Sequence, residues 1–216
     1  MTRTLDLKKE LKKCKFRIAV FGSARIKMND RVYKQVFELA KMIGMRGYDL
    51  LTGGGPGLME AASAGHDKGD KKRRAEMIGL TIKLPFEQST NKFLEYKKDF
   101  ARFSGRLETF MKLSDVIVVT KGGIGTLLEL SYAWQLIQVG HVPFKPIILV
   151  GPMWPPLIKW IKKYMLKENL VSAKDFNCIM LVKNNRDAMR AIDTYHKKYV
   201  KEDLCHHVIM PKLLDR

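Results

Sequence analysis

Short apolar runs alternate with longer amphipathic segments along most of the chain, and this alternation limits the possible folds more than any other feature. Runs such as 16–22, 77–84 and 115–120 are rich in β-branched and aromatic residues, whereas 30–47 places apolar residues at helical spacing and ends at a glycine. Strands that alternate with helices indicate βαβ units. The sequence therefore predicts an α/β fold: a single doubly wound Rossmann-like domain with a mostly parallel sheet flanked by helices.

The length and hydrophobic content fit one domain with a well-packed core. The chain has 216 residues, of which 46% are hydrophobic. Neither an internal repeat nor a Pro/Gly-rich linker divides it. We expect a basic N-terminal segment at 1–15, a Rossmann-like domain at 16–200 and a polar tail at 201–216, with an irregular stretch between the strand at 77–84 and the helix near 104.

The charge balance is strongly basic. A formal net charge of +18 and an isoelectric point near 9.8 predict attraction to anions such as nucleotides, phosphates, nucleic acids or an acidic membrane surface. The basic clusters lie far apart in the sequence, at 8–9, 12–13, 71–74 and 162–163. Scattered clusters favour solvated faces over one binding stripe.

Cysteine usage and the terminal segments predict a cytoplasmic protein without a metal site or membrane contact. The three cysteines, at 14, 178 and 205, are odd in number, and no CxxC pair occurs. The first residues contain no apolar signal-like run, and no apolar stretch approaches the ~18 residues of a membrane helix. Two adjacent histidines near Cys205 offer too few ligands for zinc.

In doubly wound folds, ligands bind beyond the carboxyl ends of the strands. Function is therefore sought in the loops that follow the expected strands, at 22–25, 52–57, 84–88 and 120–126. The loop at 52–57 contains Gly53, Gly54 and Gly55. Glycines let backbone N–H groups approach a ligand, and the following helix N-terminus favours a phosphate or carboxylate.

This first glycine loop lacks the features of the common nucleotide motifs. The third glycine of the dinucleotide fingerprint is absent at its interval, the second strand ends at Thr52 without an acidic residue for a ribose, and no GxxxxGK[ST] sequence occurs. The sequence thus argues against NAD binding and against P-loop ATP hydrolysis.

The second glycine loop carries side chains suited to chemistry: Gly122, Gly123, Gly125, Thr126 and Glu129. Glu129 lies about one helical turn beyond Thr126, so it can point back toward a ligand in the loop. Arg106 lies upstream in "GRLETF". Taken singly, Glu129 is explained by a solvent-facing position on a helix and Arg106 by a surface salt bridge. Together with two glycine loops, they predict an anion site lined by an arginine and a carboxylate.

These motifs resemble those of the LOG (lonely guy) family, whose members are often labelled possible lysine decarboxylases, and in particular its longer bacterial branch. The family signature PGGxGTxxE is matched by the second glycine loop from Gly122 to Glu129, and Arg106 falls at the expected interval upstream. The resemblance extends from "VFGSAR" through "RGYDLLTGGGPGLMEAA" and "LPFEQ" to "IILVG".

The resemblance implies a hydrolase, a nucleoside 5′-monophosphate phosphoribohydrolase that releases a free base and ribose 5-phosphate. The implied substrate is AMP or N6-modified AMP, as in cytokinin biosynthesis, with no metal or organic cofactor. It implies a homodimer, which suits the apolar residues nearly all round the helix expected at 127–138, although a core helix explains them equally well. The implied catalytic residues are Glu129 and Arg106. The implied substrate-binding residues are Gly22, Ser23, Gly53, Gly54, Gly55, Glu87, Gly122, Gly123, Gly125 and Thr126.

Three positions depart from the family pattern: Lys121 replaces the proline, Leu107 replaces the lysine after the arginine, and Leu128 replaces an acidic residue. Lys121 can add a cation near a bound phosphate, whereas the change at Leu107 removes one. A non-catalytic nucleotide-binding or carrier protein therefore remains the main alternative, and a nucleic-acid-binding protein is a third. Pyridoxal phosphate chemistry is disfavoured, because no lysine is marked out by its surroundings as a Schiff-base residue.

Overall fold

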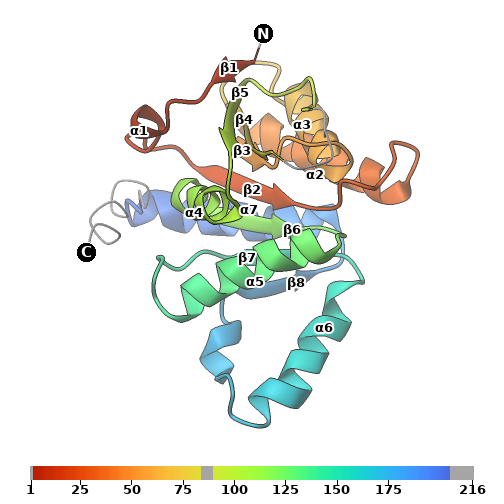
Figure 1. Cartoon of the computed structure of the whole chain (residues 1–216), viewed down its shortest axis with the longest axis vertical. Helices are drawn as coiled ribbons and strands as arrows, with labels where there is room; N and C mark the ends of the chain where they lie inside the picture. Colours follow the sequence, from red (N-terminus) through yellow and green to blue (C-terminus); the bar gives the residue numbers. More distant parts are fainter. Residues whose placement is uncertain (1, 84–89, 205–216) are drawn as a thin grey trace.

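The structure is a computed structural model that describes residues 2–83 and 90–204. Its strands are β1 (Arg3–Thr4), β2 (Arg17–Phe21), β3 (Asp49–Thr52), β4 (Met77–Ile82), β5 (Tyr96–Phe100), β6 (Val116–Val119), β7 (Ile147–Val150) and β8 (Ile179–Val182). Its helices are α1 (Leu7–Glu10), α2 (Arg31–Arg46), α3 (Leu58–Gly69), α4 (Phe103–Leu113), α5 (Ile124–Gln138), α6 (Trp154–Ile161) and α7 (Asn185–Lys201), with a π-helical turn η1 (Lys162–Leu166) and a 3₁₀ turn η2 (Ala173–Phe176). Figure 1 shows their arrangement.

The strands form one sheet in the order β1-β5-β4-β3-β2-β6-β7-β8. Every pair of neighbouring strands is parallel. After β2 the chain builds one half of the sheet outward through β3, β4 and β5, and then returns to the other side of β2 with β6. The predicted Rossmann-like α/β fold is confirmed, and the order reverses between β2 and β6, where such folds bind ligands.

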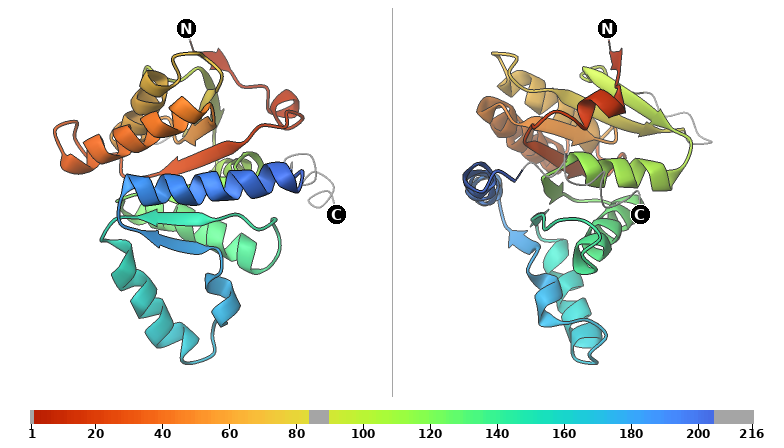
Figure 2. Two further views of the ribbon diagram at one scale, coloured as in Figure 1. Left: turned by 180° about the vertical axis from the view of Figure 1, so that it is seen from behind. Right: turned by 90° about the vertical axis from the view of Figure 1, so that its left-hand side faces the viewer.

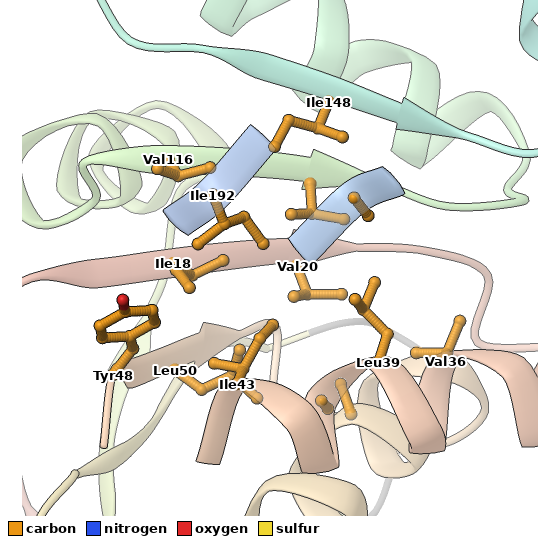
Figure 3. Packing of buried hydrophobic residues seen from close by; sticks show 14 of the residues in the cluster. Ile18, Val20, Val36, Leu39, Ile43, Tyr48, Leu50, Val116, Ile148 and Ile192 are labelled. Carbon is orange, nitrogen blue, oxygen red and sulfur yellow. The ribbon is translucent and has the colours of Figure 1, made fainter. Parts of the chain in front are cut away.

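Alternate residues of the central strands face two separate cores. Ile18 and Val20 pack toward α2, α3 and α7, whereas Ala19 and Phe21 pack toward α4, α5 and α6. Figure 2 shows α2, α3 and α7 over one face of the sheet, and Figure 3 shows the packing in that core. Burial on both faces explains why these strands read as continuous apolar runs, and each large side chain contributes about 1.5–3 kcal/mol.

Two strands at one end of the sheet were missed by the sequence pattern. β5 lies within the stretch expected to be irregular. β1 lies in the basic N-terminal segment and joins the sheet by pairing with β5. The sequence of β5, YKKDF, is mostly polar because its side chains are half-buried or exposed. A strand with this composition gives no apolar signal. Within the described residues, no helix is long and apolar enough to cross a membrane.

Candidate functional site

The loops that follow β2, β3, β4 and β6 surround a cavity of about 800 Å³ at the carboxyl edge of the sheet. The predicted site residues that line it are Gly22, Ser23, Gly53, Gly54, Gly55, Arg106, Gly123, Gly125, Thr126 and Glu129. Gly122 is not among its lining residues, and Glu87 lies outside the described residues. The structure therefore brings the two glycine loops, the arginine and the glutamate to one place.

Arg106 and Glu129 form a buried ion pair at this cavity. Arg106 lies on the first turn of α4 and Glu129 on the second turn of α5, with a distance of 3.2 Å between Nη2 and Oε1. Arg106 Nε also donates to the carbonyl oxygen of Leu80, at 2.8 Å. Only 7% of Arg106 and 9% of Glu129 is exposed. The carbonyl and the carboxylate thus fix the guanidinium, while both side chains still line the cavity.

Burial changes the proton affinity of both members of the pair. Desolvation raises the pKa of Glu129 to about 7, and the charge and hydrogen bond of Arg106 oppose that rise. Desolvation also lowers the pKa of Arg106, against the attraction of Glu129. Glu129 is therefore poised to change its charge near neutral pH, which is typical of carboxylates with a chemical role.

The first glycine loop is shaped to fit the arginine. A Cβ atom on Gly53 would lie 2.5 Å from Arg106 Nη2 and 2.6 Å from Met59 Sδ. Gly54 has a φ of +72°, a left-handed conformation that favours glycine. Larger residues here would displace the guanidinium or strain the backbone, so this loop holds the arginine in position.

The second glycine loop leaves the N-terminus of α5 open toward the cavity. Gly123 caps the helix without a side-chain hydrogen bond, and a Cβ atom on Gly123 or Gly125 would meet no atom within 4 Å. Gly122 has a different role, because a Cβ atom there would collide with the side chain of Thr126. An uncapped helix N-terminus at a cavity wall presents free N–H groups and a partial positive charge to an anion.

Some lining residues were not found from the sequence. Asp99 and Thr81 face each other across β5 and β4, and the Thr81 hydroxyl donates to Asp99 Oδ1 at 2.6 Å. This hydrogen bond keeps the pKa of Asp99 below its ordinary value. Arg25 and Lys83 add two exposed cations to the cavity. Asp99 was missed together with its strand, whereas Arg25 stands in the loop "GSAR" and could have been chosen.

The departures from the family pattern lie away from the cavity wall. Leu107 is 4% exposed and is not a lining residue. Lys121 contributes to a separate cavity of about 320 Å³ beside α2, although its carbonyl oxygen accepts a hydrogen bond from Ser23 N at 3.0 Å. Because neither side chain lines the larger cavity, these two substitutions leave its described lining unchanged.

One buried lysine is marked out by its environment, which the sequence did not indicate. Lys145 is fully buried just before β7, and its ammonium group donates to the carbonyl oxygens of Met111, at 2.6 Å, and Ser114. Burial lowers the pKa of Lys145 to about 8, although Asp115 opposes this effect. The lysine precedes its strand and so lies at the amino edge of the parallel sheet, opposite the cavity.

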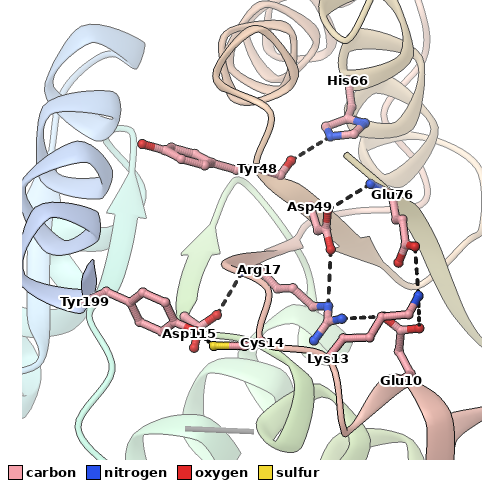
Figure 4. Close-up of polar contacts among 10 residues, drawn as sticks. All are labelled: Glu10, Lys13, Cys14, Arg17, Tyr48, Asp49, His66, Glu76, Asp115 and Tyr199. Atoms are coloured by element: carbon pink, nitrogen blue, oxygen red, sulfur yellow. Dashed lines mark hydrogen bonds and ion pairs between the residues drawn. The ribbon is translucent and has the colours of Figure 1, made fainter. Parts of the chain in front are cut away.

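A second group of buried charges also lies at that amino edge (Figure 4). The carboxylates of Glu10, Asp49 and Glu76 lie within 4.8 Å of one another, a spacing that could hold a metal ion. Arg17 forms ion pairs with Glu10 and Asp49, and Lys13 forms ion pairs with Glu10 and Glu76. Two cations thus already pair with the three carboxylates, so the group fits a structural ion network better than a metal site.

The fold and site together define a class: a Rossmann-like protein with a cavity lined by two glycine loops and a buried arginine–glutamate pair. The family described as "Possible lysine decarboxylase" matches residues 59–192. The chain belongs to this family, the LOG family.

Curated relatives carry nucleotide-related names. A pyrimidine/purine nucleotide 5′-monophosphate nucleosidase of Escherichia coli K12 is 27% identical over 141 residues, which cover 62% of this chain and 31% of that protein. A probable cytokinin riboside 5′-monophosphate phosphoribohydrolase, LOG6 of Arabidopsis thaliana, is 35% identical over 117 residues, covering 53% of this chain and 55% of that protein. The matches thus span about a third and about half of these relatives.

Solved structures share the fold. The molybdenum cofactor binding protein of Rippkaea orientalis superposes with a TM-score of 0.64 at 22% identity, covering 84% of this chain and 97% of that chain. The Moco carrier protein of Chlamydomonas reinhardtii gives a TM-score of 0.62 at 24% identity, covering 85% and 99%.

Proposed function

We propose that this protein hydrolyses the N-glycosidic bond of a nucleoside 5′-monophosphate, giving a free base and ribose 5-phosphate. The observation that carries the proposal is the buried Arg106–Glu129 pair in the wall of a cavity formed by two glycine loops. The names of the curated relatives from Escherichia coli and Arabidopsis thaliana support the same reaction class.

The 5′-phosphate would bind at the glycine loops. The uncapped N-terminus of α5 offers N–H groups around Gly123 and Gly125, and Thr126 adds a hydroxyl. A helix N-terminus with free N–H groups favours a phosphate. Arg25 and Lys83 supply positive charge at the exposed side of the cavity, and the protein's positive field draws anions toward it.

The reaction would then proceed at C1′ of the ribose. A water oxygen forms a bond to C1′ as the bond between C1′ and the base nitrogen breaks; the water loses one proton, and the departing base gains one, so the products are ribose 5-phosphate and the free base. Positive charge builds on the ribose in the transition state, so an ionised carboxylate nearby stabilises that state more than the ground state. Glu129 has this role, because it is buried where a charge interacts strongly.

Arg106 would hold the carboxylate of Glu129 in position for the reaction. Its hydrogen bond to Leu80 leaves Nη2 for Glu129, so the guanidinium holds the carboxylate in a fixed orientation. It also favours the ionised form of Glu129, which the mechanism requires. Glu87, which lies outside the described residues, is proposed as a further substrate contact.

The finer assignments rest on the family resemblance. We propose AMP or N6-modified AMP of the cytokinin type as substrate, and a cytoplasmic location. A homodimer is proposed because α5 exposes apolar side chains, with Ile124 82% and Leu128 43% exposed. Replacing Leu128 with lysine should shift the protein toward monomer in light scattering, whereas an unchanged mass would contradict an interface on α5.

The direct test incubates the protein with a panel of nucleoside monophosphates, including AMP and N6-isopentenyl AMP, and separates free base by chromatography. Glu129→Gln should abolish release, and Glu108→Gln is the matched control because Glu108 is exposed on α4. Release that survives in Glu129→Gln would contradict the assigned role.

A second candidate function is binding without cleavage, as in a nucleotide carrier or sensor. Of the three departures from the family pattern, Leu107 favours it, because it replaces a cation of the family signature although its own side chain does not line the cavity. Proteins of this fold include one described as a Moco carrier. In the same assay, a carrier would bind a ligand in the cavity and release no base from any nucleotide.

A further inference from the structure

A second large cavity lies at the opposite edge of the sheet from the candidate active site. Its volume is about 750 Å³. It is lined by residues that precede β2, β4 and β5, which are Lys15, the segment 73–76 and the segment 92–95, together with Arg3, Asp67 and Tyr96. Because the strands are parallel, their amino ends meet here, away from the glycine loops.

Basic side chains outnumber acidic ones in this cavity. Its lining includes five cations, Arg3, Lys15, Arg73, Arg74 and Lys92, and three carboxylates, Asp67, Glu76 and Glu95. Each carboxylate has a cationic partner. Arg73 Nη1 lies 2.7 Å from Asp67 Oδ1 and 3.4 Å from Glu95 Oε1, and Lys13 Nζ lies 2.8 Å from Glu76 Oε1. With five cations against three carboxylates in its lining, the cavity has an excess of positive charge.

The turn that presents Arg73 and Arg74 is held by a buried carboxylate. Asp70 is 3% exposed, and its two oxygens accept hydrogen bonds from Arg74 N at 3.1 Å and Ala75 N at 2.8 Å. Arg73 has a φ of +50°, a conformation uncommon for a residue with a side chain. The turn is therefore fixed in an unusual shape that places both arginines at the cavity.

The cations themselves are also held in place. Arg74 Nη2 donates to the carbonyl oxygen of Met45 at 2.9 Å, and the guanidinium of Arg3 lies over the ring of Tyr96, 4.4 Å from its centre. A guanidinium fixed by one contact keeps further N–H groups for a ligand and loses less side-chain entropy on binding. Such arrangements suit planar recognition of phosphate oxygens.

We propose that this cavity binds a compact anion with two or more adjacent phosphate groups, as found in inorganic tripolyphosphate and in the phosphate chain of a nucleoside triphosphate. Several fixed cations from three chain segments match several phosphates better than a single one. The volume of about 750 Å³ lies in the range of small-ligand sites. Arg3 and Lys15 of the basic N-terminal segment meet Arg73 and Arg74 of the cluster at 71–74 in this cavity, which gives part of the net charge of +18 a specific use.

The test measures binding of tripolyphosphate and of ATP by titration calorimetry at fixed ionic strength. A third ligand is an oligonucleotide that lacks a terminal phosphate. The variant Arg74→Gln/Lys92→Gln removes two lining cations, and Lys71→Gln/Lys72→Gln is matched because it removes two exposed cations that do not line the cavity. We expect the lining variant to weaken polyphosphate binding by about tenfold or more, since charge-assisted hydrogen bonds are lost. The matched variant should change it by about twofold at most. Arg3→Gln gives a second lining variant if Arg74→Gln melts at a lower temperature than the parent.

Similar affinities for tripolyphosphate and ATP would identify the phosphates as the bound group, and tighter ATP binding that remains sensitive to the lining variant would add a contact to the nucleoside. Equal loss in the lining and matched variants would overturn the proposal, because attraction would then be diffuse. Binding of the oligonucleotide alone, or of none of the three ligands, would overturn it as well.

Discussion

Two buried arginine–carboxylate groups lie at opposite edges of the same sheet. At the amino edge, Arg17 is fully buried and pairs with Glu10 and Asp49. At the carboxyl edge, Arg106 pairs with Glu129 and both line a cavity of about 800 Å³. The ion pairs at the amino edge are thus shielded, whereas the ion pair at the carboxyl edge is open to a cavity.

The difference comes from what covers each group. The N-terminal segment covers Arg17, since Glu10 belongs to α1 and Lys13 follows it. Arg106 is covered on one side by the Leu80 carbonyl and faces two glycine loops on the other. Both groups perturb a carboxylate, because burial raises the pKa of Asp49 to about 6 and that of Glu129 to about 7. A shifted pKa therefore does not by itself indicate function, whereas access from a cavity distinguishes the two groups.

The largest expected effect on stability is at the amino edge. Arg17→Met leaves Asp49 buried without its cation and Glu10 with Lys13 alone, so we expect a loss of about 3–5 kcal/mol in the free energy of unfolding. Arg190→Leu, at an exposed ion pair on α7, is the control and should cost at most about 1 kcal/mol. Denaturant titration measures both. Base release per folded molecule should survive in Arg17→Met; its loss would mean that the Arg17 group also contributes to catalysis.

The next effect is at the carboxyl edge. Arg106→Gln removes the cation that orients Glu129, and kcat/KM should fall by about a hundredfold. Stability should change less than in Arg17→Met, because Glu129 can take up a proton when its partner is lost. Arg102→Gln is the control on the same helix end, since Arg102 is exposed and makes no side-chain capping bond. Equal activities of Arg106→Gln and Arg102→Gln would mean that Arg106 has no role in the reaction, and the two edges of the sheet would then not differ in function.

The pH dependence should separate function from stability. If ionised Glu129 stabilises the transition state, kcat/KM rises with pH until about 7 and falls about tenfold per pH unit below that value. Stability should change in the opposite direction. Since the folded-state pKa is raised from 4.5, the native protein binds more protons than the unfolded chain between that value and about 7, and its free energy of unfolding falls as pH rises through this window. A parent and a Glu129→Gln variant with parallel stability profiles would refute the assigned pKa.

The smallest expected effect tests the fit of the first glycine loop. Gly53→Ala places a methyl group against Arg106 and Met59, and a small displacement of the guanidinium should lower kcat/KM by about tenfold. Gly105→Ala is matched on α4, where the new atom would lie 3.7 Å from Phe100, an ordinary contact. It should retain activity and gain about 0.5–1 kcal/mol in stability from helix propensity. Equal activities would mean that the loop does not position Arg106.

The sequence predicted the features that depend on local pattern. Apolar runs buried on both faces located β2, β3, β6 and β7, and the glycines after the strands located the cavity. The sequence placed Arg106 and Glu129 at one site but did not predict their ion pair, because their separation of 23 positions carries no signal of contact.

Features that depend on long-range contacts were not predicted. β5 is polar because it is only partly buried, and Asp99 was missed with it. The burial of Lys145 depends on carbonyl groups of Met111 and Ser114, more than thirty positions away. The clusters at the N-terminus and at 71–74 looked separate, because only the strand order brings their segments together.

The central claim is that Glu129 carries out chemistry in a site that also binds the nucleotide. The most direct measurement is a single-turnover experiment, in which excess protein is mixed with AMP and with the best substrate of the panel, and bound nucleotide and released base are followed in the same samples. Parent protein should bind the nucleotide and release one base per ribose 5-phosphate, and Glu129→Gln should bind it with similar affinity and release about a hundredfold less or none. Equal rates in both proteins, or binding without release by the parent, would contradict the account.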